Sequence, residues 1–288
     1  MKQARTATVF THRRPSETAE ALSTLCRAAE RAGVELRFSP EETAKHGLQG
    51  SSASLIDAPL DHGVDLCLVL GGDGTILHGL RNYVGTGVPV FGVNFGEVGF
   101  LATVDPENTE EGIDRALRGD FEVLSLPSIE LKGPGERPMP AINDVSFQRK
   151  HGLRVADLAY SVGEDEVGRV RCDGLVVATP AGSTGYNLAN GGPVMAWGVE
   201  GFVVSFIAPH SLTARALVIA PGDTITVSNR SREEPAVMTV DGRPAGELEP
   251  GASFEVSFSE ARATLAQIPG ASFYHRLREK FGRLATGV

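Results

Sequence analysis

A glycine-rich loop around one aspartate is the clearest candidate for chemistry in this sequence. Gly71, Gly72 and Gly74 surround Asp73, and Thr75 follows. Glycines let the backbone turn tightly, so that several N–H groups converge at the start of a helix and bind phosphate oxygens there. A carboxylate in such a loop can accept the proton of a hydroxyl that is being phosphorylated, or meet a metal ion. The loop therefore predicts a phosphate-donor site. The simpler alternative is a strand-to-helix turn with Asp73 as its cap.

A second loop of the same kind follows the next apolar segment. Asn94 begins it, and Gly96 and Gly99 permit close approach of a ligand to the backbone. Ligands of open α/β sheets gather at the carboxyl ends of the strands. We therefore expect this loop and the first one to line a single crevice, with Asn94 as a donor to a phosphate or a ribose hydroxyl.

The longest candidate segment spans residues 171–193. It combines a short apolar strand with closely spaced glycines and small hydroxyl residues, which form a close-fitting polar wall, and Tyr186 is placed to stack on a base. Upstream, Asn143 and Asp144 put a side-chain amide beside a carboxylate, a pair that suits a purine edge and a ribose diol. These residues predict a nucleotide site in the second half of the chain.

The elements that must position these loops follow two different patterns. Up to about residue 120, apolar runs at 64–70 and 88–93 alternate with segments of helical spacing. Near-continuous apolar runs are typical of parallel strands that are covered on both faces. Beyond residue 120, short β-rich segments recur about every 8–12 residues, separated by turn signals such as Asp241-Gly242.

These patterns predict a chain of two domains. We expect an α/β domain with a Rossmann-like parallel sheet over 1–120 and an all-β, sandwich-like domain over 121–268. The last segment, 269–288, carries Phe273, Leu277 and Phe281 at helical spacing with basic residues beside them. We expect it to form a helix that packs back on the first domain, because its apolar stripe needs covering.

The composition excludes several classes of function. The chain has 288 residues, of which 27 are basic and 36 acidic, giving a net charge of −9. Affinity for nucleic acid or an anionic membrane rests on basic patches, so neither is an expected partner. Cys26, Cys67 and Cys172 are widely spaced, which fits a reducing compartment and excludes a structural zinc cluster. With no apolar segment typical of a signal peptide or a membrane span, we expect a cytoplasmic protein.

The order of the motifs resembles the NAD kinase family. The matching segments are GGDGT at 71–75, NFGEVGFL at 94–101, ND at 143–144, DGLVVATPAGSTGY at 173–186, NGGP at 190–193 and PHSLTAR at 209–215. GGDGT alone is shared with diacylglycerol, sphingosine and 6-phosphofructokinase-type kinases. The TPAGSTGY segment makes the resemblance more specific.

The resemblance implies phosphoryl transfer from ATP, or from polyphosphate, to the 2′-hydroxyl of the adenosine ribose of NAD, with NADH as an alternative acceptor. Asp73 matches the family's proton acceptor. Mg²⁺ or another divalent cation is implied, held through the phosphates, with Asp73 as the protein group that could meet it.

The resemblance also implies a set of binding residues. The implied NAD-binding residues are Gly74, His78, Asn143, Asp144, Arg154, Arg171, Asp173, Ala181, Thr184, Gly185, Tyr186, Asn187, Leu188, Ala189 and Arg243, and the phosphate-donor loop comprises Gly71, Gly72, Thr75 and Asn94. The resemblance also implies a homodimer or homotetramer.

The sequence departs from the family pattern inside the third segment. Ala181 stands where threonine is common, Gly185 where alanine is common, and Ala189-Asn190 where serine-alanine is usual. The hydroxyls of the usual threonine and serine are absent here, and with them hydrogen bonds to the substrate. Their absence affects the expected preference between NAD and NADH. Two other functions stay open: a lipid or sugar kinase that shares GGDGT, and a catalytically silent dinucleotide-binding sensor. The retained Asp73 argues against the sensor, and the lack of an amphipathic membrane-facing helix argues against the lipid kinase.

Overall fold

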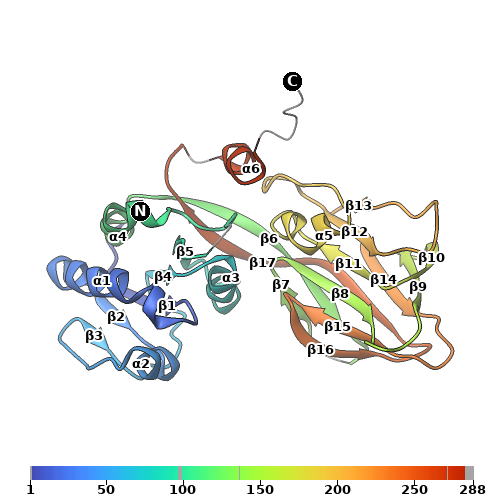
Figure 1. Cartoon of the computed structure of the whole chain (residues 1–288), viewed down its shortest axis with the longest axis horizontal. Helices are drawn as coiled ribbons and strands as arrows, with labels where there is room; N and C mark the ends of the chain where they lie inside the picture. Colours follow the sequence, from blue (N-terminus) through green and yellow to red (C-terminus); the bar gives the residue numbers. More distant parts are fainter. Residues whose placement is uncertain (1, 97–98, 136, 271, 283–288) are drawn as a thin grey trace. The chain divides into compact units, whose positions relative to one another are not determined.

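The computed structural model describes residues 2–96, 99–135, 137–270 and 272–282, and the chain divides into two compact units (Figure 1). Unit 1 contains the residues up to Ser125 together with those from Ala263 onward, and unit 2 runs from Leu126 to Arg262. The residues 263–268, which the sequence pattern groups with the β-rich segments, lie in unit 1 because the end of the last strand pairs there.

Unit 1 is built on a parallel sheet. Its strand order is β3-β2-β1-β4-β5, followed by the end of β17, and each neighbouring pair is parallel. The strands are β1 (Thr6–Thr11), β2 (Glu35–Arg37), β3 (Ser54–Leu55), β4 (Leu66–Leu70), β5 (Pro89–Val93) and β17 (Ser253–Gln267). β4 and β5 are buried at every position, as their continuous apolar runs predicted.

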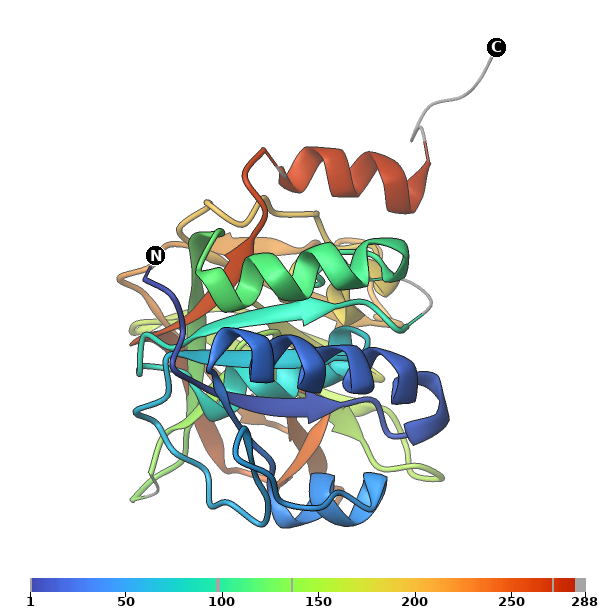
Figure 2. The same ribbon diagram turned by 90° about the vertical axis from the view of Figure 1, so that its left-hand side faces the viewer.

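Helices cover both faces of this sheet, which explains the continuous burial. The helices of unit 1 are α1 (Ala19–Ala32), α2 (Pro40–His46), α3 (Asp73–Asn82), α4 (Thr109–Arg118) and α6 (Phe273–Phe281), with short 3-10 turns η1 (Pro15–Glu17) and η2 (Pro106–Asn108). α1 and α4 lie side by side on one face (Figure 2), where they pack on Leu66, Leu68 and Leu70. α3 lies on the other face, where Gly79 approaches Cys67 and Val69.

The C-terminal helix α6 packs within unit 1, as predicted. Its first turn is capped by Ser272, whose Oγ accepts the N–H of His275 at 3.1 Å. The ring of Phe273 packs against that of Phe100, with 6.5 Å between centroids. Arg276, which the sequence pattern places only beside the apolar stripe, is 8% exposed and lies in the contact.

Unit 2 is a β-sandwich, as predicted. One sheet has the order β10-β9-β14-β17, with β6 paired to β17 and β7 paired to β6, and the other has the order β13-β12-β11-β8-β15-β16. The strands are β6 (Glu122–Lys132), β7 (Met139–Ala141), β8 (Asp144–Arg149), β9 (Ala156–Val162), β10 (Asp165–Cys172), β11 (Gly174–Ala178), β12 (Phe202–Ile207), β13 (Leu217–Ile219), β14 (Thr224–Asn229), β15 (Ala236–Val240) and β16 (Arg243–Leu248). Phe147 and Phe202 of one sheet share a core with Ile225 and Val227 of the other.

Two short helical pieces, η3 (Gly182–Thr184) and α5 (Tyr186–Ala189), follow β11 in unit 2. Among the described residues, no helix combines the length and apolar character that crossing a bilayer requires.

Candidate functional site

Asp73 is held as an oriented hydrogen-bond acceptor at the start of α3. It directly follows β4 and the Gly71-Gly72 turn. Its Oδ2 accepts the N–H of Phe100 at 2.8 Å, and its Oδ1 accepts that of Leu101 at 3.0 Å. The side chain is half-buried, and the N-terminus of a helix favours a negative charge. The loop thus presents a fixed carboxylate beside backbone that can bind phosphate oxygens.

The two glycine loops of unit 1 lie in direct contact. A Cβ added to Gly96 would lie 2.9 Å from the Cα of Gly72, and one added to Gly99 would lie 3.0 Å from Oδ1 of Asp73. Asn94 is 4% exposed, and its Oδ1 accepts the N–H of Gly96 at 3.0 Å, so this oxygen shapes its own loop. Of the predicted loop, Glu97 and Val98 lie outside the described residues.

The other predicted residues of this loop differ in exposure. Gly74 is exposed, while Thr75 is half-buried and its N–H donates to the carbonyl of Gly72 at 2.9 Å. His78, one turn further along α3, is half-buried, and its ring packs on the edge of Phe10 with 4.8 Å between centroids.

In unit 2, Asp241 holds the Asn143-Asp144 pair through the backbone. Its Oδ1 accepts the N–H groups of Asn143 at 2.7 Å and Asp144 at 3.2 Å, and its Oδ2 accepts that of Ile142 at 3.1 Å. Its own N–H donates to the carbonyl of Asp144 at 2.8 Å. Asp241 has a φ of 48°, in the left-handed region that aspartate tolerates in turns. The sequence pattern identified it only as a turn residue.

Asp144 is a buried carboxyl beside a second carboxyl. It is 9% exposed, and burial together with the nearby Asp241 raises its pKa to about 7. A carboxyl that titrates near neutral pH can be present either as an acceptor for ribose hydroxyls or as a donor.

We expect the stability of the wild type to fall relative to Asp144→Asn as the pH rises from about 4 to 7. The Asp144 carboxyl ionises near 3.8 in the unfolded chain but near 7 in the folded one, so the folded state binds more protons between these values. Its contribution is therefore fully present below the lower value and lost as the pH passes the upper one. Asparagine does not titrate, so this pH dependence is absent in the variant. In the wild type, it changes the unfolding free energy by a few kcal/mol between the two pKa values.

Urea unfolding followed by the fluorescence of Trp197, the one tryptophan of the chain and a buried residue of unit 2, measures this difference at each pH. The exposed Asp165→Asn is the control for loss of a carboxylate. Parallel pH profiles for wild type and Asp144→Asn would contradict the prediction.

The turn after β11 packs against the same pair. The N–H of Thr179 donates to the carbonyl of Asn143 at 2.9 Å, and its hydroxyl donates to the carbonyl of Ile142 at 2.5 Å. A Cβ added to Gly182 would lie 2.0 Å from the carbonyl oxygen of Asn143. Turn and pair therefore form one tightly packed structure.

A second charged cluster lies at the other end of β11. The Nε of Arg149 donates to Oδ1 of Asp173 at 2.6 Å, and both side chains are about one-third exposed. Arg149 also donates to the carbonyl of Leu153, which precedes the exposed Arg154. The sequence pattern missed Arg149, since its pairing depends on β8 and β11 being neighbours.

The side chain of Tyr186 is influenced by residues at both ends of β11. Its hydroxyl donates to Oε1 of Gln148 at 3.4 Å, and burial raises its pKa, with smaller contributions from Asp144 and Asp173. Asn187 is fully buried, and its Nδ2 donates to the carbonyls of Ser183 and Pro193, so it holds the loop in shape.

The remaining predicted residues of unit 2 differ in exposure. Arg171, Gly185, Ala189 and Arg243 are exposed, Thr184 and Leu188 are half-buried, and Ala181 is buried. Cys172, next to two of the predicted residues, is buried, and burial raises the pKa of its thiol to about 12, which fits a wall residue and not a nucleophile.

A divalent cation fits this chain only if a ligand supplies most of its coordination. Within the described ranges, no group of three or more His, Cys, Asp or Glu side chains is arranged to hold a metal ion. Each oxygen of Asp73 has lone-pair capacity beyond the N–H bond it accepts. This fits a cation held by phosphates with one carboxylate nearby, the usual environment of Mg²⁺.

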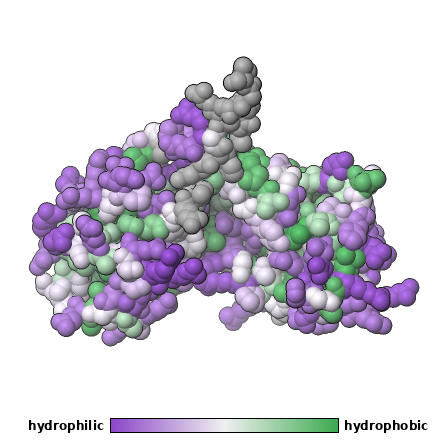
Figure 3. All heavy atoms as spheres, viewed as in Figure 1, coloured by the Kyte–Doolittle hydropathy of each residue, from purple (hydrophilic) through white to green (hydrophobic). Residues whose placement is uncertain are grey.

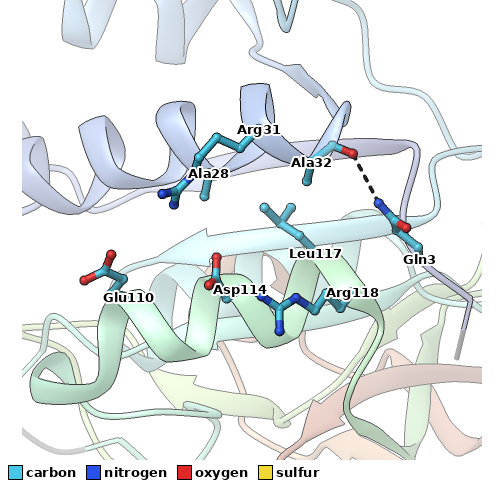
Figure 4. A pocket seen from close by; sticks show the side chains of 8 residues that line it. All are labelled: Gln3, Ala28, Arg31, Ala32, Glu110, Asp114, Leu117 and Arg118. Atoms are coloured by element: carbon cyan, nitrogen blue, oxygen red, sulfur yellow. Dashed lines mark hydrogen bonds and ion pairs between the residues drawn. The ribbon is translucent and has the colours of Figure 1, made fainter.

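A hollow of about 590 Å³ in unit 1 lies apart from these residues (Figure 4). It is formed by α1, α4 and the start of the chain, and Arg31, Glu110, Asp114 and Arg118 bring charges of both signs to it. None of the predicted site residues lines it, so we do not assign it to the site.

Comparison with known proteins finds similarity over both halves of the chain. The family model of the ATP-NAD kinase N-terminal domain matches residues 9–121, and that of the C-terminal domain matches 142–268. The NAD kinase of Lachnoclostridium phytofermentans is 32% identical over 250 residues, which cover 83% of this chain and 87% of that protein.

Two solved structures have a similar fold. The yeast NADH kinase complexed with NADH has a TM-score of 0.87 at 21% identity, covering 100% of this chain and 90% of that one. An NAD kinase from Archaeoglobus fulgidus in complex with ATP has a TM-score of 0.74 at 27% identity, covering 96% and 97%.

Proposed function

The chain belongs to the NAD kinase family, and from this membership we propose that it transfers the terminal phosphoryl group of ATP to the 2′-hydroxyl of the adenosine ribose of NAD, giving NADP. The family resemblance predicted from the motifs is confirmed, and with it the class of enzyme, a phosphotransferase. The observation that carries the mechanism is the carboxylate of Asp73, fixed at the start of α3 by two backbone N–H groups.

In the proposed reaction, the ribose 2′-oxygen forms a bond to the γ-phosphorus while the bond to the bridging oxygen breaks and ADP leaves. Asp73 accepts the proton of the 2′-hydroxyl. The amides of the glycine loop at the start of α3 bind donor phosphate oxygens. A divalent cation, when bound to the phosphates, offsets charge on the transferred group. Because the transition state of such a transfer is loose, positioning and electrostatics matter more than the strength of the base.

Unit 2 supplies the proposed residues that hold NAD. Asn143 and Asp144 bind the adenosine through its purine edge and ribose hydroxyls, and Tyr186 stacks on a base. Asp173 binds a further hydroxyl and is itself oriented by Arg149, since an ion pair at 2.6 Å restricts both side chains. Arg171 steadies the new phosphate.

The choice of donor and acceptor is supported by the similar proteins. The Archaeoglobus fulgidus structure contains ATP, and the yeast structure contains NADH. We therefore propose ATP as the donor and Mg²⁺ as the cation, with polyphosphate and NADH as the alternatives to compare. The three free cysteines support a reducing, cytoplasmic compartment.

We also propose a homodimer or homotetramer. Apolar patches interrupt the hydrophilic face of the molecule in Figure 3. In unit 2, Leu212 is 93% exposed, and Leu217 and Val218 are exposed on β13, an edge strand. An edge strand with apolar side chains is suited to pairing with another chain. Light scattering of the purified protein measures the mass.

The proposed function is tested by NADP formation from NAD, ATP and Mg²⁺. We expect NADP with ATP, and parallel reactions with polyphosphate and with NADH define the preferences. NAD binding without turnover under every condition would overturn the kinase and indicate a dinucleotide sensor. Phosphorylation of a diacylglycerol or sugar in place of NAD would indicate the other kinases that share GGDGT.

A further inference from the structure

We propose that Arg276, on the C-terminal helix α6, is a positioning residue for Asp73. It acts through the backbone at residues 100–102, which lies between the two side chains. The proposal rests on the proposed role of Asp73 in proton transfer and adds to it a second charged residue, 203 positions further along the chain.

One peptide group joins Arg276 to Asp73. Nη1 of Arg276 donates to the carbonyl of Phe100 at 3.0 Å. The other end of that same peptide group is the N–H of Leu101, which donates to Oδ1 of Asp73 at 3.0 Å. A guanidinium and a carboxylate therefore hold opposite ends of a single peptide dipole.

Further contacts fix the guanidinium in place. Nη1 also donates to the carbonyl of Ala102, and Nη2 donates to Oε1 of Gln267 at 2.6 Å. Arg276 and Gln267 are 8% and 6% exposed, so water competes little for these bonds. Arg276 thus binds the carbonyls on both sides of Leu101, whose N–H it helps to aim at Asp73.

The arrangement strengthens the contact that orients the carboxylate. A positive charge at the carbonyl end polarises the peptide group, and consecutive hydrogen bonds of this kind reinforce one another at low local dielectric. Burial lowers the pKa of Arg276, and the carboxylates of Asp73, Asp105 and Glu279 oppose that shift. The positive charge of Arg276 and the negative charge of Asp73 therefore stabilise each other across the peptide group between them.

The simpler role for Arg276 is to anchor α6, and the structure allows the two roles to be separated. The helix has its own anchors, since Ser272 caps it and Phe273 packs on Phe100. Arg278 is a matched control, because it lies on the same helix but is exposed and contacts His275. An anchoring role affects stability, whereas a positioning role affects turnover and the exchange of the Leu101 amide.

The test compares Arg276→Met, Arg276→Lys and Arg278→Met for kcat, for the KM values of NAD and ATP, and for hydrogen exchange in residues 99–103. We expect Arg276→Met to lower kcat by roughly 10- to 30-fold, as loss of a buried charge-assisted bond implies. Its KM values should change less than threefold, and the Leu101 amide should exchange faster. Arg276→Lys, which keeps the charge, should recover most of the turnover, and Arg278→Met should match the wild type.

An Arg276→Met variant with wild-type kcat, or one that raises KM alone, overturns the inference. So does a loss of kcat while the Leu101 amide stays fully protected. If Arg276→Met does not fold, Arg276→Lys decides: low turnover with unchanged Leu101 exchange overturns the inference, and near-normal values of both support it. A wild type that forms no NADP refutes the proposed function, whereas an active wild type with an equally active Arg276→Met refutes this inference alone.

Discussion

Replacing Asp73 with asparagine is expected to lower the kcat of NADP formation by about 10³-fold, within the range typical for loss of a general base. An amide of the same size accepts no proton from the ribose hydroxyl at neutral pH and carries no charge toward the cation. It also offers only one acceptor oxygen, while the N–H groups of Phe100 and Leu101 both point at this side chain. One of the two bonds is therefore lost, and the unfolding free energy should fall by about 1.5–3 kcal/mol.

Steady-state kinetics with NAD and ATP, together with thermal unfolding, measure both effects. The KM values should stay within about threefold, because the nucleotides are held mainly by other groups. Asp114→Asn is the matched control: it also removes one negative charge from unit 1, at the surface of α4 where Asp114 pairs with Arg118, and should leave kcat unchanged. A kcat within tenfold of the wild type for Asp73→Asn would show that Asp73 is not the proton acceptor.

The elements that carry the candidate site were predictable where the information is local in the chain. The loop at 71–75 and the run at 173–186 are marked by residue types that a tight turn or a close backbone approach requires. The structure places the loop at the end of β4, and the run covers β11 and the turn that follows it. The buried strands β4 and β5 were recognisable for the same reason, since a run covered on both faces has no polar positions.

Partners from distant parts of the chain were not predictable. Asp241 lies 97 residues from Asp144, and its sequence context indicates only a hairpin turn. Arg149 meets Asp173 because β8 and β11 are neighbours, which depends on the strand order of the sheet. Arg276 had a weak signal, since it lies three positions after Phe273 and so shares the buried face of α6. The sequence pattern placed it only among the basic residues beside the apolar stripe.

The second large effect is expected for Gly182→Ala, which should reduce the affinity for NAD by about 10²-fold, because a misplacement of about 1 Å can cost that much at a functional site. The added Cβ would lie 2.0 Å from the carbonyl oxygen of Asn143 and 2.4 Å from its carbon, and neither backbone atom can rotate away. Either η3 or the Asn143-Asp144 segment must move. The hydrogen bond from the N–H of Thr179 to that carbonyl is then strained. So is the hydrogen bond from the N–H of Asn143 to the carboxylate of Asp241.

The φ of Gly182 is not in the left-handed region, so alanine is compatible with its backbone conformation and the effect arises from the close contact alone. Gly222→Ala tests this reasoning, because a Cβ added there meets no atom within 4 Å, and its NAD affinity should equal that of the wild type. Calorimetric titration with NAD measures the affinities, and the fluorescence of Trp197 shows whether unit 2 stays folded. A folded Gly182→Ala variant with wild-type affinity would contradict the proposal that η3 and the Asn143-Asp144 pair together hold NAD, because one of the two must have moved.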